Sequence, residues 1–178
     1  KFFHCGSKGV VHSEDEQLIK KNSEMFKGQS NPSIHAKIRG NEVAGAAVRE
    51  AVTIGGNIHI THSSTREEMM LIKAKGLSCD VTPHHLFLTA EELKKQGNYV
   101  KMNPPLRSKE DVEALWEAVK DGTVSCIATD HAPHLREEKE QGYWEAPSGV
   151  PGVQTMLPLL LDAVNKKRLS LQQLIKNL

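Results

Sequence analysis

Cysteine is scarce in this sequence, and what there is forms no recognisable framework. The three cysteines are far apart, and no Cys-x-x-Cys pair occurs. An odd number of isolated cysteines argues against a disulfide scaffold, and the missing pair argues against a structural zinc ribbon. Cys79 and Cys126 lie in apolar runs. This placement favours reduced thiols in a cytoplasmic protein.

Long apolar runs and an excess of charge are also missing. No stretch approaches the roughly 20 apolar residues that span a bilayer. The first twelve residues, KFFHCGSKGVVH, lack the apolar core of a secretory signal. Lys and Arg number 23 against 22 Asp and Glu, so no field of one sign attracts nucleic acid or an anionic membrane. We therefore expect neither as a partner, and 178 residues suffice for one domain with a real core.

What the sequence does contain is a regular alternation of β-rich runs and helical segments. Helix starts are indicated at Ser13, Thr65, Thr89, Ser108 and Ser170, and Pro158 is expected to kink an apolar helix. The expected strands cover residues 9–13, 57–62, 77–82 and 123–129, and the main helices follow them at 13–28, 41–56, 65–76, 89–97, 108–122 and 153–167. This order predicts an α/β fold with a mainly parallel sheet, equivalent to half of a (β/α)₈ barrel.

Polar residues stand at the ends of the expected strands. The first strand ends in His12, the second in His62, and the fourth in Asp130. Because the carboxyl ends of barrel strands meet on one face, these three side chains are expected to converge. Two imidazoles and a carboxylate suit Zn²⁺ or a similar divalent metal.

Each histidine also has a simpler interpretation. A single histidine at a strand end, such as His12, is commonly a hydrogen-bonded polar cap. His59 lies three residues from His62, so period-two alternation turns it away from the site. His84 and His85 follow a proline, and either orient a neighbour or face solvent. His4 and His35 are expected on the surface. The joint pattern of strand ends is what favours a site.

At these residues the chain resembles the dihydroorotases of the amidohydrolase superfamily, and the bacterial type most closely. The matching segments are VVHSED, IHITHSST, CDVTPHHLFLT, KMNPPLRS, ATDHAPH and APSGVPG. The resemblance implies a TIM-type barrel of which strands five to eight are present. It further implies a zinc-dependent cyclic amide hydrolase with one or two divalent metals, which interconverts dihydroorotate and N-carbamoyl-L-aspartate in pyrimidine biosynthesis.

The resemblance also assigns roles to individual residues. His12, His62 and Asp130 correspond to metal ligands, and Asp130 also to the general acid/base. Asn103 and His134 correspond to substrate contacts. Ser148 and Gly149 are expected to add backbone contacts to the substrate. A simpler interpretation of NPPLR is a rigid proline turn with Arg107 in solvent.

The chain departs from the family pattern in what it lacks. The family's HxH pair with its arginine, and its carboxylated lysine or aspartate, are not in this sequence. We expect residues 1–178 to form a single partial barrel domain, without the N-terminal half and the flanking β-domain, and to be inactive alone. Possible partners are a second copy of the chain or aspartate transcarbamoylase. Two alternatives remain: an allantoinase or hydantoinase, and a non-catalytic structural partner of aspartate transcarbamoylase.

Overall fold

The computed structural model describes residues 7–178, so His4 and Cys5 lie outside the described residues. Strands and helices alternate along this part of the chain, as the sequence predicts. The strands are β1 (Gly9–His12), β2 (Ile58–Thr61), β3 (Ser78–Val81) and β4 (Cys126–Ile127). The helices are α1 (Glu16–Met25), η2 (Pro32–Ile34), α2 (His35–Ile38), α3 (Asn41–Ile54), α4 (Arg66–Lys75), α5 (Pro83–Phe87), α6 (Glu91–Gln96), η3 (Gly97–Val100), α7 (Lys109–Asp121), α8 (Arg136–Lys139), α9 (Val153–Asn165) and α10 (Leu171–Asn177).

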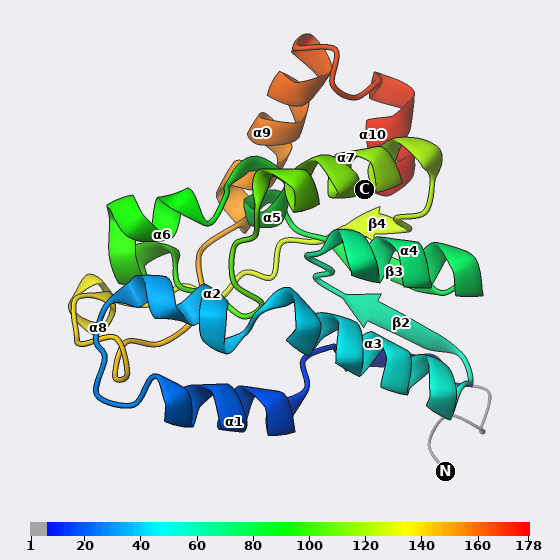
Figure 1. The fold of residues 1–178 in the computed structure, drawn as a ribbon. Helices are drawn as coiled ribbons and strands as arrows, with labels where there is room; N and C mark the ends of the chain where they lie inside the picture. The colour runs from blue at the N-terminus through cyan, green and yellow to red at the C-terminus, as the bar shows by residue number, and fades with distance from the viewer. Residues whose placement is uncertain (1–6) are drawn as a thin grey trace.

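The strands form one parallel sheet in chain order, β1-β2-β3-β4 (Figure 1). Gly9 to His12 of β1 pair with Ile58 to Thr61 of β2, and all three strand pairs are parallel. The regular part of β4 is shorter than predicted. Ser125 and Ala128 nevertheless donate backbone hydrogen bonds to β3, at 2.9 and 3.0 Å. All four strands therefore point their carboxyl ends the same way, which confirms the predicted α/β architecture.

Helices α3, α4 and α7 pack next to one another against the sheet (Figure 1). Between them and the strands lies the main apolar core, to which Val48, Ile60, Ile72 and Trp116 contribute. The Trp116 indole nitrogen is satisfied inside this core because it donates to the Leu86 carbonyl at 2.6 Å. Burial of these side chains fixes the strands and thereby the residues at their ends.

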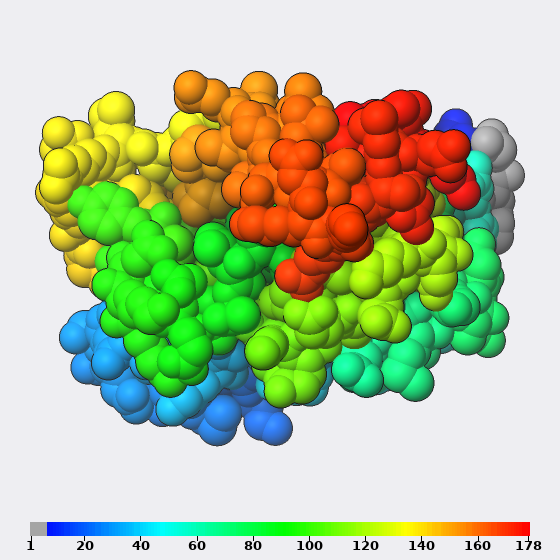
Figure 2. Space-filling model, turned by 90° about the horizontal axis from the view of Figure 1, so that it is seen from above, coloured from blue at the N-terminus to red at the C-terminus, as the bar shows by residue number. Residues whose placement is uncertain are grey.

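Helices α9 and α10 cover a broad part of the face seen in Figure 2. Val153, Leu157 and Leu161 of α9 lie four residues apart and are all exposed. In the described residues, no helix is both long and apolar enough to cross a membrane.

Helix starts follow the predicted capping signals with two corrections. The helix predicted to start at Thr89 begins at Glu91, with Ala90 as its N-cap and no side-chain cap bond. The Thr65 hydroxyl accepts from the Glu68 N–H at 3.2 Å while the Glu68 carboxylate accepts from the Thr65 N–H at 2.8 Å, a complete capping box. Ser108 and Ser170 also cap their helices. The prediction of a capping box at Ser13 was wrong. The helix begins at Glu16, so Asp15 is the residue in position to cap it.

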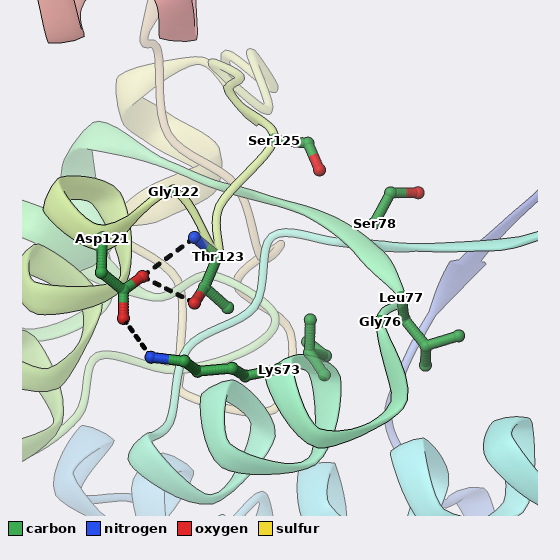
Figure 3. Close-up of a pocket in the computed structure, with 9 residues that line it drawn as sticks. Lys73, Gly76, Leu77, Ser78, Asp121, Gly122, Thr123 and Ser125 are labelled. Atoms are coloured by element: carbon green, nitrogen blue, oxygen red, sulfur yellow. Dashed lines mark hydrogen bonds and ion pairs between the residues drawn. The ribbon is translucent and has the colours of Figure 1, made fainter.

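A hollow of about 420 Å³ opens at the amino ends of β3 and β4 (Figure 3). Its rim carries an ion pair between Lys73 and Asp121, and Asp121 also accepts from the Thr123 amide and hydroxyl. Asp121, Lys73 and Thr123 thus satisfy one another's hydrogen-bonding groups. In a barrel fold this end of the strands serves stability, and the opposite end carries the chemistry.

Candidate active site

Two histidines meet at the carboxyl ends of β1 and β2. The His12 Nδ1 and the His62 Nε2 are 2.9 Å apart, and the rings meet edge to face at 4.6 Å between centroids. The sheet register brings them together, because His12 lies opposite Thr61, the residue before His62. His62 has a φ of +37°, a backbone conformation that is uncommon outside glycine and concentrates at functional sites.

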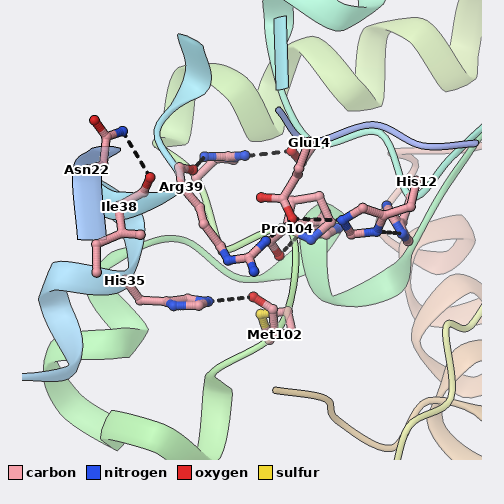
Figure 4. A network of polar contacts seen from close by, with 12 residues as sticks. His12, Glu14, Asn22, His35, Ile38, Arg39, Met102 and Pro104 are labelled. Carbon is pink, nitrogen blue, oxygen red and sulfur yellow. Dashed lines mark hydrogen bonds and ion pairs between the residues drawn. The ribbon is translucent and has the colours of Figure 1, made fainter. Parts of the chain in front are cut away.

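Glu14 holds the other nitrogen of His12 (Figure 4). The His12 Nε2 lies 2.9 Å from Glu14 Oε2, and Arg39 forms an ion pair with the same carboxylate. Burial pushes the pKa of Glu14 upward, but the hydrogen bond with His12 and the charge of Arg39 outweigh it and hold this pKa below its ordinary value. An ionised Glu14 accepts the Nε2 proton, so the Nδ1 lone pair of His12 faces His62.

Sequence reasoning missed Glu14 although a signal was present. It stands two residues after His12 in VVHSED, and alternate residues of an extended segment share one side. A carboxylate at that spacing from a candidate metal-ligating histidine is a candidate for the hydrogen bond that orients the ring.

His62 is held from behind by Asp80 of β3. The Asp80 carboxylate accepts from the His62 main-chain N–H at 2.7 Å and bonds the His59 Nε2 at 2.9 Å. His59 thus contacts the site through Asp80. Burial, and next the neighbouring His12, lower the pKa of His62. At neutral pH its ring is therefore uncharged, the state that a metal ligand requires.

The donor atoms fit part of a divalent-metal site. Two ring nitrogens face one another, a buried carboxylate orients one ring, and the buried His62 Nδ1 has no hydrogen-bond partner among the described residues. Asp130 is exposed, has a φ of +45°, and its charge acts on His62. Within residues 7–178, no three His, Cys, Asp or Glu side chains gather closely enough to hold a metal ion. The structure therefore brings together His12 and His62 but does not group Asp130 with them.

Asn103 lies in the loop between η3 and α7, where its peptide bond to Pro104 is cis. Its side-chain oxygen is buried and has no hydrogen-bond partner among the described residues. A buried acceptor without a partner carries a free-energy penalty, which a ligand that donates a hydrogen bond relieves.

Arg107 in the same loop is buried, not in solvent as the simpler interpretation required. Its Nε donates to the Ser64 hydroxyl at 3.0 Å, and its Nη1 donates to the Arg39 carbonyl at 2.5 Å. The NPPLR loop is thereby joined to the segment that follows His62.

His134, Ser148 and Gly149 come together in two adjoining loops. The His134 Nε2 lies 3.2 Å from the Ser148 carbonyl, and His131 pairs with Val150 as a parallel bridge. Gly149 has a φ of +144°, and a Cβ there would lie 2.6 Å from the Ala132 carbonyl, so only glycine fits. The four expected substrate contacts thus lie in loops that touch, because the Gly149 N–H donates to the Lys101 carbonyl at 2.9 Å, two residues before Asn103.

His35 is buried, so the prediction that it lies on the surface was wrong. Only 2% of it is exposed. The η2 turn and α2 carry its ring inward, where Nε2 donates to the Met102 carbonyl at 2.9 Å and Nδ1 accepts from the Tyr143 hydroxyl at 3.0 Å. Burial lowers the pKa of His35 to about 4. The ring ties α2 to the loop of Asn103 (Figure 4).

His84 and His85 are likewise buried and do not face solvent. His85 bonds the Thr82 hydroxyl at 2.8 Å and the Pro104 carbonyl at 3.0 Å, so it orients the loop of Asn103. The buried His84 Nε2 has no partner among the described residues. Burial, and then the nearby His62, lower the pKa of His84 to about 4.

Solved structures with the same architecture define the class. The chain superposes on a D-hydantoinase from Bacillus sp. AR9 with a TM-score of 0.91 and 26% identity, covering 98% of this chain and 42% of that one. It superposes on an L-hydantoinase (dihydropyrimidinase) from Arthrobacter aurescens with a TM-score of 0.90 and 30% identity, covering 97% and 42%. These proteins are TIM-barrel amidohydrolases, so the four strands are part of such a barrel.

Within this class, sequence similarity is to dihydroorotases. A dihydroorotase of Halobacterium salinarum is 44% identical over 168 residues, which is 92% of this chain and 39% of the relative. A dihydroorotase of Methanosarcina acetivorans is 40% identical, with 96% and 40% covered. No family profile matches the chain. The chain belongs to the dihydroorotase family and spans about two fifths of the length of these curated relatives.

Proposed function

We propose that these residues are the C-terminal half of a dihydroorotase barrel, strands five to eight, in a single partial domain covering 1–178. The whole protein reversibly hydrolyses the cyclic amide of (S)-dihydroorotate to N-carbamoyl-L-aspartate, a step of cytoplasmic pyrimidine biosynthesis. The observation that carries this proposal is the facing pair of His12 and His62, oriented by Glu14 at the carboxyl ends of adjacent strands. Identities of 40–44% to dihydroorotases support the choice of substrate.

The metal ligands in this proposal are His12, His62 and Asp130, holding one or two Zn²⁺ or similar ions. A divalent metal held by these residues would supply hydroxide at neutral pH, because metal binding lowers the pKa of water. Asp130 takes the proton released at the attacking oxygen and delivers it to the leaving ring nitrogen. Asp130 is exposed three residues beyond β4, which leaves its carboxylate accessible to substrate.

Substrate contacts in this proposal come from the adjoining loops. Asn103 presents an unpaired amide oxygen to a ring N–H. His134 binds the substrate carboxylate, and Ser148 and Gly149 contribute main-chain groups. The His134 Nε2 donates to the Ser148 carbonyl. This hydrogen bond fixes the position of the His134 ring relative to the Ser148 main chain.

The test measures metal content and dihydroorotate ring opening in the longer protein and in the 178 residues alone. We expect the longer protein to turn over at roughly 10 s⁻¹, as a typical enzyme does, and the 178 residues to be inactive. Asp130→Asn should abolish turnover in the longer protein. The matched control is Asp121→Asn, because Asp121 lies on the rim of the hollow at the opposite end of the strands.

Other outcomes would replace the proposal. A longer protein that opens hydantoin or allantoin but not dihydroorotate is a different cyclic amidohydrolase. A folded, metal-free and inert protein that binds aspartate transcarbamoylase is a structural partner. Sedimentation of the longer protein with and without aspartate transcarbamoylase separates a homo-oligomer from a mixed complex.

A further inference from the structure

Two lysines are buried in the loops beside the candidate site. Lys101 is 7% exposed and Lys139, at the end of α8, is 6% exposed. Lysine is almost never buried this far unless its charge is paired. Yet neither ammonium has an ion pair with a carboxylate in the part of the chain that the structure describes. Both instead bind main-chain carbonyl oxygens.

Lys139 uses all of its donors on three carbonyls. Its ammonium lies 3.0 Å from the carbonyl oxygens of Lys101, Pro147 and Gly149. An ammonium has three N–H donors, so this set satisfies it completely. The Lys101 ammonium in turn donates to the carbonyls of Tyr143 and Ala146, each at 2.6 Å.

These carbonyls belong to the segments that carry the expected substrate contacts. Lys101 is two residues from Asn103, and Ser148 stands between the two acceptors Pro147 and Gly149. His134 lies in the loop that leads into α8, the helix of Lys139. One side chain therefore connects three segments that are separate in sequence.

Burying the Lys139 ammonium carries a free-energy penalty. We therefore expect this side chain to do more than fill space. Burial, followed by the charge of Lys101, lowers the pKa of Lys139 to about 8. A methionine of similar length would fill the same volume without that penalty, but the carbonyl oxygens of Pro147 and Gly149 would lose the ammonium donor. The Lys101 carbonyl would keep only the Gly149 N–H.

We propose that Lys139 is a positioning residue for substrate binding, which holds the loops of Asn103, His134 and Ser148–Gly149 in the arrangement that receives a cyclic amide with a carboxylate. The inference rests on the proposed function. It assigns Lys139 no contact with substrate or metal.

The experiment compares Lys139→Met with Lys95→Met in the longer protein. Lys95 is an exposed lysine of α6 that pairs only with Glu92, so it controls for loss of a charge. In Lys139→Met we expect KM for dihydroorotate to rise about tenfold or more while kcat falls less than about threefold. Metal content should stay unchanged, and hydrogen exchange should accelerate at the amides of Ser148 and Gly149, the latter of which donates to the Lys101 carbonyl. Lys95→Met should match wild type.

An unchanged KM in a folded Lys139→Met protein overturns the inference and leaves the proposed function intact. An equal fall in kcat and metal content also overturns it, because that pattern indicates general damage. If Lys139→Met does not fold, Lys101→Met removes the companion contacts to residues 143 and 146 and must give the same shift in KM. A wild-type protein without ring opening contradicts the proposed function instead, and hydrogen exchange then decides whether Lys139 holds the loops.

Discussion

Glu14 decides which nitrogen of His12 is free. Because the carboxylate accepts the Nε2 proton, the Nδ1 lone pair is fixed toward His62. Replacement by glutamine keeps the size of the side chain but removes its charge. We expect Glu14→Gln to weaken divalent-metal affinity by about 10- to 100-fold, the usual effect of losing such a partner.

Competition with a chromogenic chelator measures this affinity without reference to turnover. Glu16→Gln is the matched control, because Glu16 is an exposed carboxylate in the first turn of α1. Equal metal affinity in Glu14→Gln and wild type would show that Glu14 does not orient a metal ligand.

His35 makes folding stability depend on pH. Its pKa lies near 4 in the folded protein, because burial disfavours the charged ring, against an ordinary value of 6.5. Between these values the unfolded chain binds more protons, so stability falls as pH is lowered through this window. The loss attributable to His35 is about 3 kcal/mol by pH 4.

Urea unfolding at several pH values between 7 and 4 measures this dependence. The His35→Gln variant offers an amide donor for the Met102 carbonyl and an amide acceptor for the Tyr143 hydroxyl, but it does not titrate. The pH dependence should become shallower without vanishing, because the pKa values of His84 and His85 are also lowered by burial. If the free energy of unfolding depended on pH equally in wild type and His35→Gln, the lowered pKa of His35 would be contradicted.

The positions of single side chains were predictable only where the fold itself brings them together, as at the carboxyl ends of parallel strands. The meeting of His12 and His62 follows from parallel strands whose ends share a face. The burial of His35, Lys101 and Lys139 does not follow from any local pattern. Their partners are main-chain carbonyls and a tyrosine far along the chain, and lysine is ordinarily a surface residue.

At the scale of elements, the capping box at the start of α4 stabilises the segment that directly follows His62. The Thr65 hydroxyl accepts from the Glu68 N–H, and Glu68 accepts from the Ser64 and Thr65 amides. We expect Thr65→Ala to lower the free energy of unfolding by about 1 kcal/mol. Thermal or urea unfolding provides the measurement. Thr53→Ala is the control, because Thr53 is an exposed helix residue that bonds only the Arg49 carbonyl of its own helix.

Elements were predicted well where a cap and an apolar period agree, as in α4 and α7. The error at Ser13 arose because SEDE offers two capping residues, Ser13 and Asp15. In the folded chain Ser13 is buried and Asp15 accepts from the Leu18 N–H, which the local sequence does not show. The short β4 was overestimated because an apolar run does not show where strand geometry ends. Backbone hydrogen bonds from Ser125 and Ala128 continue the pairing beyond its regular part.

At the scale of the whole molecule, the sheet has β1 at one edge and β4 at the other. An edge strand offers unpaired backbone donors and acceptors, and Val10 of β1 is 68% exposed. We expect the isolated 178 residues to self-associate, and Val10→Lys to shift them toward monomer. Sedimentation velocity at several concentrations tests this. Met70→Lys changes a similarly exposed residue on α4 and should have little effect.

The overall architecture was predictable because strand order along the chain equals strand order in the sheet. What the sequence did not predict is which side chains link the loops at the carboxyl ends of the strands to one another. Those connections run through Arg107, His85 and Lys139, whose polar ends reach carbonyls and hydroxyls that no sequence periodicity identifies.

The bonds of Lys139 also set the unit in which this protein can be redesigned. If the loop 143–150 alone were replaced by that of a hydantoinase, the buried Lys139 ammonium would lose its acceptors, the carbonyls of Pro147 and Gly149. Residues 99–103 and 131–151 should therefore be transplanted together. Libraries that recombine the two segments as one block should yield more folded members with altered ring preference than libraries that vary each segment independently.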